Sequence, residues 1–149
     1  MSDEARMVEV GQKEVTDRVA VAEAEVLMRP ETVERLQAGT AKGDPVEAAR
    51  VAGLMAVKRT PDLLPFCHPV AITGAEVGVT AHRSEGRVAI RATVRARDRT
   101  GVEMEALTAC AVAALSVYDT AKAFQRDAVI SRVALVEKRG GAGGDYRAS

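Results

Sequence analysis

The elements that the sequence predicts follow the order strand, two helices, a pair of strands joined by a tight turn, a long helix and a last strand. Alternation with a period of two indicates the strands, while capping residues and three- and four-residue spacing of apolar positions indicate the helices. This split βαβ order places helices on one face of an antiparallel four-stranded sheet. We therefore predict an α+β, ferredoxin-like sandwich that forms a single domain over residues 1–149.

The first part of the chain supplies an arm, a strand and a short helix. Residues 1–18 have weak periodicity and are expected to form an N-terminal arm. Residues 19–28 (VAVAEAEVLM) alternate over part of their length, as a strand does, although their alanines and glutamates also suit a helix. A short helix follows, with Pro30 in its first turn and Gly39 after its end.

Capping residues and alternation predict a second helix and a hairpin. Asp44 is the expected N-cap and Glu47 stands three residues later, as in a capping box. This helix should end before Pro61. Two alternating runs, residues 70–81 and 86–97, flank a turn-like segment and predict a β-hairpin with one buried face.

The long helix, residues 101–124, is nearly free of charge between its two ends. Thr100 can cap it, with Glu103 at the capping-box position. A core-facing stripe is expected at Met104, Leu107, Ala111, Ala114, Tyr118 and Ala121. The opposite side is hardly polar in its middle, and one sheet covers only one side of a helix, so we predict that a second subunit covers the other. A last strand (131–138) and a flexible Gly-rich tail (139–149) complete the chain.

The charged residues at the two ends of the long helix are candidate site residues. Glu105 and Asp119 lie on nearly the same face but about 21 Å apart along the axis. Two such helices packed antiparallel about a two-fold axis would bring Glu105 of one chain toward Asp119 and Lys122 of the other. Asp119 opposes the helix dipole, so helix stability does not explain its position. Lys122 is either its partner in an ordinary ion pair or a functional group.

Composition excludes several classes of protein. The chain is 47% hydrophobic and 28% charged, and no apolar run approaches the roughly 20 residues that cross a bilayer. The N-terminus lacks an export signal, so we expect a cytoplasmic protein. Zero net charge and 3% aromatic residues argue against nucleic acid as a partner. The two cysteines form neither a metal-ligand spacing nor a disulfide framework.

Three further segments carry residues suited to binding or proton transfer. Phe66, Cys67 and His68 lie between two prolines, which restrain the direction of the imidazole; His68 is either a functional group or a hydrogen-bonded residue that closes a loop. Lys42 precedes a helix N-terminus, where anions are favoured. Lys138 begins a basic segment that either holds phosphate or is solvated. Arg outnumbers Lys sixteen to five, and four of the five lysines fall inside the segments singled out.

Several of these motifs together resemble one enzyme family. The segments KGDPVEAARVAGLMAVKRT, LLPFCHP, TGVEMEALTACAVAALSVYDTAKA and EKRGG are similar to the MoaC family, the cyclic pyranopterin monophosphate synthases of molybdenum cofactor (molybdopterin) biosynthesis. The similarity runs from about Met7 to Tyr146. It implies a ferredoxin-like lyase that assembles as a hexamer, a trimer of dimers, with active sites at the dimer interfaces. The implied reaction converts 3′,8-cyclo-7,8-dihydroguanosine 5′-triphosphate, a GTP-derived substrate, into cyclic pyranopterin monophosphate and pyrophosphate.

The resemblance also implies roles for particular residues. Asp119 matches the catalytic aspartate, with Lys122 and Lys42 as lysines that transfer protons or face phosphate. Residues expected to bind substrate are Phe66, Cys67, His68, Met104 and Glu105, supported by the polar groups Glu103 and Lys138. The tail reads GGAGGD where the family usually has Lys-Ser, which argues against a phosphate role for the tail.

No cofactor or metal centre is expected, although Mg²⁺ can arrive with the triphosphate. The alternative function is a non-catalytic module of the same fold that senses a small ligand between subunits. Such a module would need the covered helix but no proton-transferring lysines.

Overall fold

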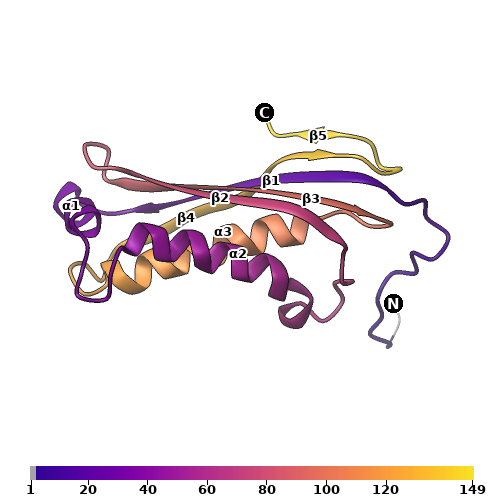
Figure 1. The fold of residues 1–149 in the computed structure, drawn as a ribbon, viewed down its shortest axis with the longest axis horizontal. Coiled ribbons are helices and arrows are strands. Elements are labelled where there is room, and N and C mark those ends of the chain that lie inside the picture. Colours follow the sequence, from indigo (N-terminus) through magenta and orange to yellow (C-terminus); the bar gives the residue numbers. More distant parts are fainter. Residues whose placement is uncertain (1–2) are drawn as a thin grey trace.

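The computed structural model describes residues 3–149 and has two layers, a sheet and a layer of helices on one of its faces (Figure 1). The elements are β1 (Thr16–Leu27), α1 (Pro30–Ala38), α2 (Pro45–Leu63), β2 (Ile72–His82), β3 (Arg87–Asp98), α3 (Glu103–Ala121), β4 (Val129–Arg139) and β5 (Tyr146–Arg147). The predicted α+β class and the order of the elements are confirmed.

The sheet has five strands rather than the four predicted, in the order β2-β3-β1-β4-β5, and every neighbouring pair is antiparallel. The additional strand, β5, lies in the tail that we expected to be flexible. It pairs with β4 through Lys138 and Tyr146, and the N–H of Ala148 donates to the carbonyl of Val136. β1 begins at Thr16, inside the predicted arm, because the chain pairs with Asp98 of β3 from that residue onward.

The two faces of the sheet differ in polarity, as the alternation in β1 and β3 requires. Small apolar residues of β1 and β3 point at the helices and are buried, among them Ala22 and Ala92. The other face carries cross-strand ion pairs such as Arg91–Glu23 and Arg95–Glu76. The sheet therefore buries one face within the single chain.

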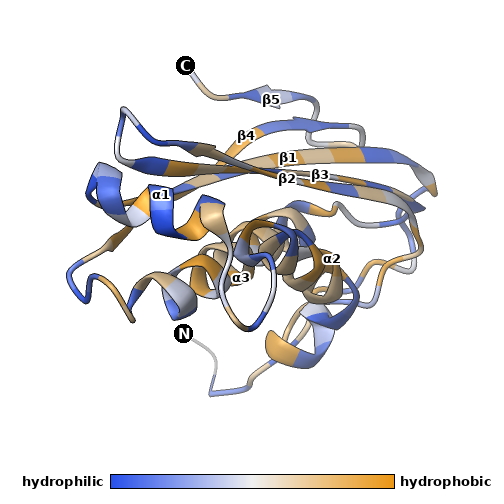
Figure 2. Ribbon diagram, turned by 60° about the vertical axis from the view of Figure 1, so that its left-hand side comes forward, coloured by the Kyte–Doolittle hydropathy of each residue, from blue (hydrophilic) through white to orange (hydrophobic). Residues whose placement is uncertain are grey.

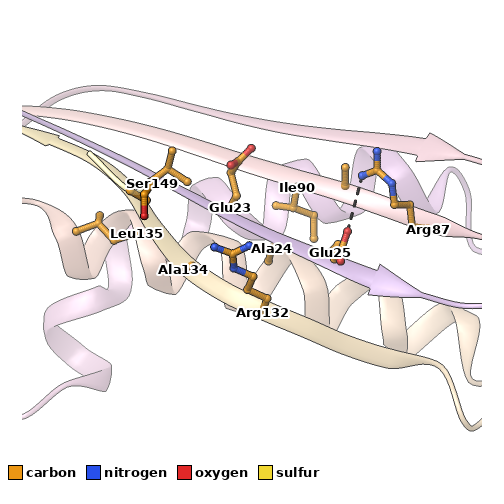
Figure 3. A pocket seen from close by; sticks show the side chains of 12 residues that line it. Glu23, Ala24, Glu25, Arg87, Ile90, Arg132, Ala134, Leu135 and Ser149 are labelled. Carbon is orange, nitrogen blue, oxygen red and sulfur yellow. Dashed lines mark ion pairs between the residues drawn. The ribbon is translucent and has the colours of Figure 1, made fainter. Parts of the chain in front are cut away.

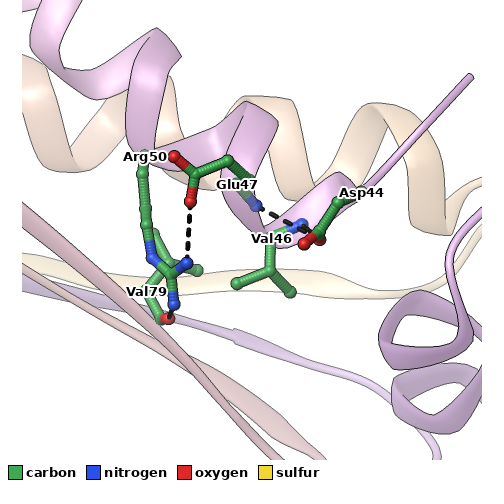
Figure 4. A network of polar contacts seen from close by, with 5 residues as sticks. All are labelled: Asp44, Val46, Glu47, Arg50 and Val79. Carbon is green, nitrogen blue, oxygen red and sulfur yellow. Dashed lines mark hydrogen bonds and ion pairs between the residues drawn. The ribbon is translucent and has the colours of Figure 1, made fainter.

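The N-terminus of α2 is capped as predicted. The Asp44 carboxylate accepts hydrogen bonds from the backbone N–H groups of Val46 and Glu47 (Figure 4). The capping box is incomplete, because the Glu47 carboxylate pairs instead with Arg50, whose guanidinium also donates to the Val79 carbonyl of β2. These bonds fix the start of α2 over the sheet.

The C-terminal end of α2 differs from the prediction. The helix continues through Pro61 to Leu63 instead of ending before Pro61. A proline in the last turn removes only its own N–H from the hydrogen-bond ladder, and the Leu64 N–H still donates to the Thr60 carbonyl. The helix therefore ends one turn later than the proline alone suggests.

The N-terminus of α3 was also predicted incorrectly. Val102 is the N-cap, without a side-chain capping bond, so Thr100 does not cap the helix. Glu103, assigned to a capping box, instead extends its carboxylate to Lys138 of β4, with 2.6 Å between the Glu103 Oε1 and Lys138 Nζ atoms. A contact across elements thus replaces the local one that the spacing suggested.

The buried stripe of α3 lies on a different face from the predicted one. The buried residues are Glu105, Ala106, Ala109, Cys110, Ala113, Ala114, Val117 and Ala121. Of the predicted stripe only Ala114 and Ala121 are fully buried, and Met104 is 42% exposed. The segment has no charged residue between Glu105 and Asp119 to set the phase of the pattern, so apolar spacing alone left several faces possible.

Small residues let the helices pack closely on each other and on the sheet. A Cβ atom added at Gly53 of α2 would lie 2.8 Å from the Val77 side chain and 3.3 Å from the Ala109 carbonyl of α3. Hydrophobic residues predominate along α3, whereas hydrophobic and hydrophilic residues both occur along the strands (Figure 2). Within residues 3–149, no helix has the length and apolar character needed to span a membrane.

Candidate active site

A cavity of about 500 Å³ opens where the loop after α2 meets the first turn of α3. Its walls come from the loop residues that follow α2, the segment around Gly101 and the N-terminal arm. Six residues predicted from the sequence line it: Phe66, Cys67, His68, Glu103, Met104 and Glu105. The structure therefore brings together most of the substrate-binding residues that the family resemblance implied.

Glu105 is the buried acid of this cavity. Its side chain is 2% exposed, and its Oε1 atom has no hydrogen-bond partner within residues 3–149. The Cys67 thiol lies near the other oxygen, with 3.8 Å between Sγ and Oε2. Burial raises the pKa of Glu105, and nearby Glu103 raises it further. The carboxyl group is thereby biased toward its protonated form, which can donate as well as accept hydrogen bonds.

Cys67 is a packed thiol rather than an activated nucleophile. Burial raises its pKa, and the adjacent Glu105 raises it further, so the thiol holds its proton. The second cysteine, Cys110, lies wholly in the core, where burial raises its pKa to about 12. Neither cysteine has the electropositive surroundings that favour a thiolate.

Two apolar side chains remain exposed at the mouth of the cavity. Phe66 is 55% exposed and Met104 is 42% exposed, although both could be buried by a flat apolar ligand or by another chain. Together with the buried acid they form a surface that is largely apolar with few polar groups, as small-molecule sites usually are.

The imidazole of His68 is held by the N-terminal arm. Its Nε2 atom lies 2.6 Å from the carbonyl oxygen of Val8. Val8 and Val10 line the same cavity, so the arm forms one of its walls. The bond to Val8 fits the interpretation of His68 as a residue that closes a loop, but His68 also faces the cavity, so both interpretations stay open.

A second hollow, of about 800 Å³, adjoins the first. The two share Lys13, Thr100, Gly101 and Glu103, and Lys138 lines only the second. The Glu103–Lys138 ion pair therefore lies where the two hollows meet. The Gly-rich segment around Gly141 forms the far wall, where a Cβ atom would collide with the guanidinium of Arg18.

Sequence reasoning missed two cationic residues of this region. Lys13 lines both hollows, and no ion pair involves it within the described chain. The chain has five lysines against sixteen arginines, and Lys13 is the one lysine outside the segments singled out from the sequence. The rarity of lysine was the signal that could have identified it. Arg18 is buried at the start of β1 and donates to the carbonyls of Asp98 and Arg99. Both lie in the segment that weak periodicity assigned to an arm.

The second group of predicted residues lies at the other end of α3. Asp119 and Lys122 form an ion pair, with 2.7 Å between Oδ1 and Nζ and side chains 70% and 54% exposed. The hydrogen bond from Lys122 lowers the pKa of Asp119, which the positive charge of Lys42 lowers further. The same bond raises the pKa of Lys122. Within one chain Asp119 lies about 21 Å along α3 from Glu105, and Lys122 lies one turn further.

A third hollow, of about 380 Å³, lies on the outer face of the sheet (Figure 3). Its charged side chains include Glu23, Glu25, Arg87 and Arg132, and Arg87 pairs with Glu25. Arg132 has a positive φ of 52°, at the irregular pairing between β1 and β4. None of the residues predicted from the sequence lies here, so the candidate site is on the helix side.

No group of three or more His, Cys, Asp or Glu side chains is arranged to hold a metal ion within residues 3–149. The charged residues of the two hollows are the cations Lys13, Arg18 and Lys138, with Lys138 paired to Glu103, and the acids Glu14 and Glu105. The three cations suit an anionic ligand.

The fold and these residues define a small α+β protein with an apolar cavity that contains a buried acid, next to a hollow lined by both cationic and acidic side chains. The chain belongs to the MoaC family, whose sequence profile matches residues 7–141. A cyclic pyranopterin monophosphate synthase from Roseiflexus sp. is 53% identical over 97% of this chain and 92% of its own length. Synthases of the same name from Streptomyces griseus and Pelotomaculum thermopropionicum are 53% and 54% identical, over 96% of this chain and 80% and 85% of theirs.

Proposed function

We propose that this chain is a cyclic pyranopterin monophosphate synthase of molybdenum cofactor biosynthesis. The observation that carries the proposal is the match to synthases of that name along almost the whole chain at about half identity. The reaction takes 3′,8-cyclo-7,8-dihydroguanosine 5′-triphosphate, forms a cyclic phosphate when a sugar hydroxyl attacks the α-phosphorus, and releases pyrophosphate. A cytoplasmic location is part of the same proposal.

The cavity at the start of α3 would hold the purine-derived ring system. Phe66 and Met104 offer apolar contact. Burial raises the pKa of Glu105, and in its protonated form this group would offer one hydrogen-bond donor and acceptor capacity to the polar edge of the ring. The adjoining hollow, with Lys13 and Lys138, would take part of the triphosphate charge. Mg²⁺ could accompany the triphosphate as part of the substrate.

The proton-transferring residues would come from a second copy of the chain. Leu115, in the middle of α3, is 56% exposed in the single chain, so the helix face between the two charged ends is uncovered. Two chains related by a two-fold axis with antiparallel α3 helices would cover this face. The Asp119, Lys122 and Lys42 group of one chain would then face the cavity of the other.

Association would also change the protonation of Lys122. In the single chain its ion pair with exposed Asp119 raises the pKa of Lys122, which opposes proton transfer near neutral pH. Burial of the pair by a second chain would add desolvation, which lowers a lysine pKa. We propose a hexamer built as a trimer of such dimers, with one site at each end of every dimer interface.

The test is a turnover assay with the purified chain and the triphosphate, following both cyclic pyranopterin monophosphate and pyrophosphate. Sharing of sites is tested by mixing Glu105→Gln chains with Asp119→Asn chains, each inactive alone. Sites built from two chains predict recovered activity, because some interfaces then contain one site with both native residues. No recovery despite proven subunit exchange excludes shared sites, and unchanged substrate with the native chain excludes the enzyme.

A further inference from the structure

The N-terminal arm reaches the candidate site through a backbone carbonyl. Residues 3–15 form no helix or strand, and Figure 1 shows the arm passing from the start of β1 toward the end of α2. Between residues 7–14 and the remainder of the described chain, the bond from His68 to Val8 is the one hydrogen bond present. The side chain of Val8 is 67% exposed, so the carbonyl, not the side chain, makes the attachment.

Two internal bonds shape the arm next to this attachment. The Gly11 N–H donates to the Glu9 carboxylate, and the Lys13 N–H donates to the Val10 carbonyl. The resulting turn leaves Val10 and Lys13 as lining residues of the cavity. The arm is thus a preformed segment that contributes cavity wall and is attached at the imidazole.

A carbonyl oxygen can only accept a hydrogen bond, so Nε2 of His68 must carry a proton while the contact is present. The alternative neutral tautomer would place the Nε2 lone pair against the carbonyl oxygen at 2.6 Å, which is repulsive. In the neutral ring Nδ1 is then the bare nitrogen, and no hydrogen bond to Nδ1 is present within residues 3–149. Any gain or loss of a proton by the ring is therefore confined to Nδ1.

We propose that residues 7–13 act as a strap that fixes the tautomer and direction of His68, so that the ring meets the substrate through Nδ1. The role of His68 toward the substrate rests on the function proposed above, whereas the existence of the strap does not. Val8 is a positioning residue in this scheme, acting through its main-chain carbonyl. An unattached imidazole could rotate and exchange tautomers, and a misplaced proton donor or acceptor is a poor catalyst.

The direct test is NMR of the full chain labelled with ¹⁵N at histidine. Only two histidines are present, and His82→Gln identifies the signals of His68. We expect a slowly exchanging, downfield imidazole proton on Nε2 of His68, unchanged in Val8→Ala and absent when residues 1–9 are removed. A proton on Nδ1, or a signal that survives the truncation, overturns the proposal.

Point variants test the strap in the full-length chain. His68→Gln places an amide donor near the position of Nε2, whereas His68→Ala removes the donor. Trypsin cleavage after Arg6 should therefore be several-fold faster in His68→Ala than in the native chain and nearly unchanged in His68→Gln. Equal cleavage rates in all three contradict the strap.

Turnover separates this proposal from the function on which it rests. Removal of residues 1–9 keeps Val10 and Lys13 and should lower kcat about 10- to 100-fold, with no change in the unfolding temperature. Full kcat in the truncated chain overturns the catalytic role of the strap. A native chain that forms no product refutes the proposed function, whereas the NMR and cleavage results would still decide whether the strap exists.

Discussion

Glu105 is the residue at which folding and binding make opposite demands. A carboxyl group that is 2% exposed, with one oxygen that has no hydrogen-bond partner among residues 3–149, is costly to bury, yet the same features leave it ready for a ligand. The sequence predicted that Glu105 lies near the N-terminal end of an apolar helix. Its burial depends on the loop that carries Cys67, which lies 38 positions earlier. The local sequence pattern could therefore identify Glu105 as a candidate residue, but it could not predict its protonation state.

Glu105→Gln should change how stability depends on pH. Because the folded-state pKa of Glu105 is raised above its ordinary value of 4.5, the contribution of Glu105 to stability is most favourable while this group is protonated. That contribution is present below the ordinary value and is lost as the pH rises through the raised pKa. Urea unfolding at pH 4 and pH 8 should show the variant gaining stability relative to the native chain at the higher pH. Glu76→Gln, at an exposed ion pair, is the control and should show no such gain; an equal response would contradict the burial effect.

Asp119 and Lys122 should matter for activity and hardly at all for stability. Their side chains are mostly exposed, and exposed ion pairs contribute little to folding. We expect Asp119→Asn and Lys122→Ala to lower kcat about 10²- to 10⁴-fold, the usual range for loss of a proton-transferring group. Asp62→Asn removes a comparable exposed pair with Arg59 and should leave kcat unchanged. Turnover near the native value in both Asp119→Asn and Lys122→Ala would remove this pair from the chemistry.

At the scale of elements, local chemistry predicted the hairpin and the start of α2, because alternation and an N-cap are complete within a few residues. It failed for α3, where Thr100 and Glu103 offered a local cap but Lys138 offers the carboxylate a stronger partner. The strongest local signal, Asp44, caps α2, and Lys42, two residues earlier, lies near enough to the C-terminal end of α3 for its charge to lower the pKa of Asp119.

Asp44→Ala should therefore weaken both α2 and the site at its start. The carboxylate satisfies two backbone N–H groups, and loss of such a cap costs about 0.5–2 kcal/mol of the free energy of unfolding. Asp44→Ser retains an acceptor and should recover most of the loss in a denaturant titration. If the alanine and serine variants unfold at the same denaturant concentration, the cap does not stabilise the fold.

At the scale of the whole molecule, the sequence predicted the two groups of site residues and the structure separates them. Residues of the loop after α2 converge with the start of α3, while Asp119, Lys122 and Lys42 gather at its other end. The walls of the cavity could not be predicted, because Val8 and Lys13 come from an arm whose position depends on one long-range bond to His68. Among the described residues of a single chain, no hydrogen bond or ion pair joins the two groups.

Leu115→Arg should test whether a second chain brings the two groups of site residues together. Leu115 is 56% exposed on α3 between the two groups, so a charge there would be buried without a partner in the proposed dimer but solvated in the monomer. We expect sedimentation velocity to show a smaller species with native circular dichroism and turnover reduced at least 100-fold. Thr80→Arg, at an exposed position of β2 on the sheet face opposite the helices, adds the same side chain away from α3 and should keep native mass and turnover. If Leu115→Arg retains both, α3 is not the interface, and the residues at its two ends act without each other.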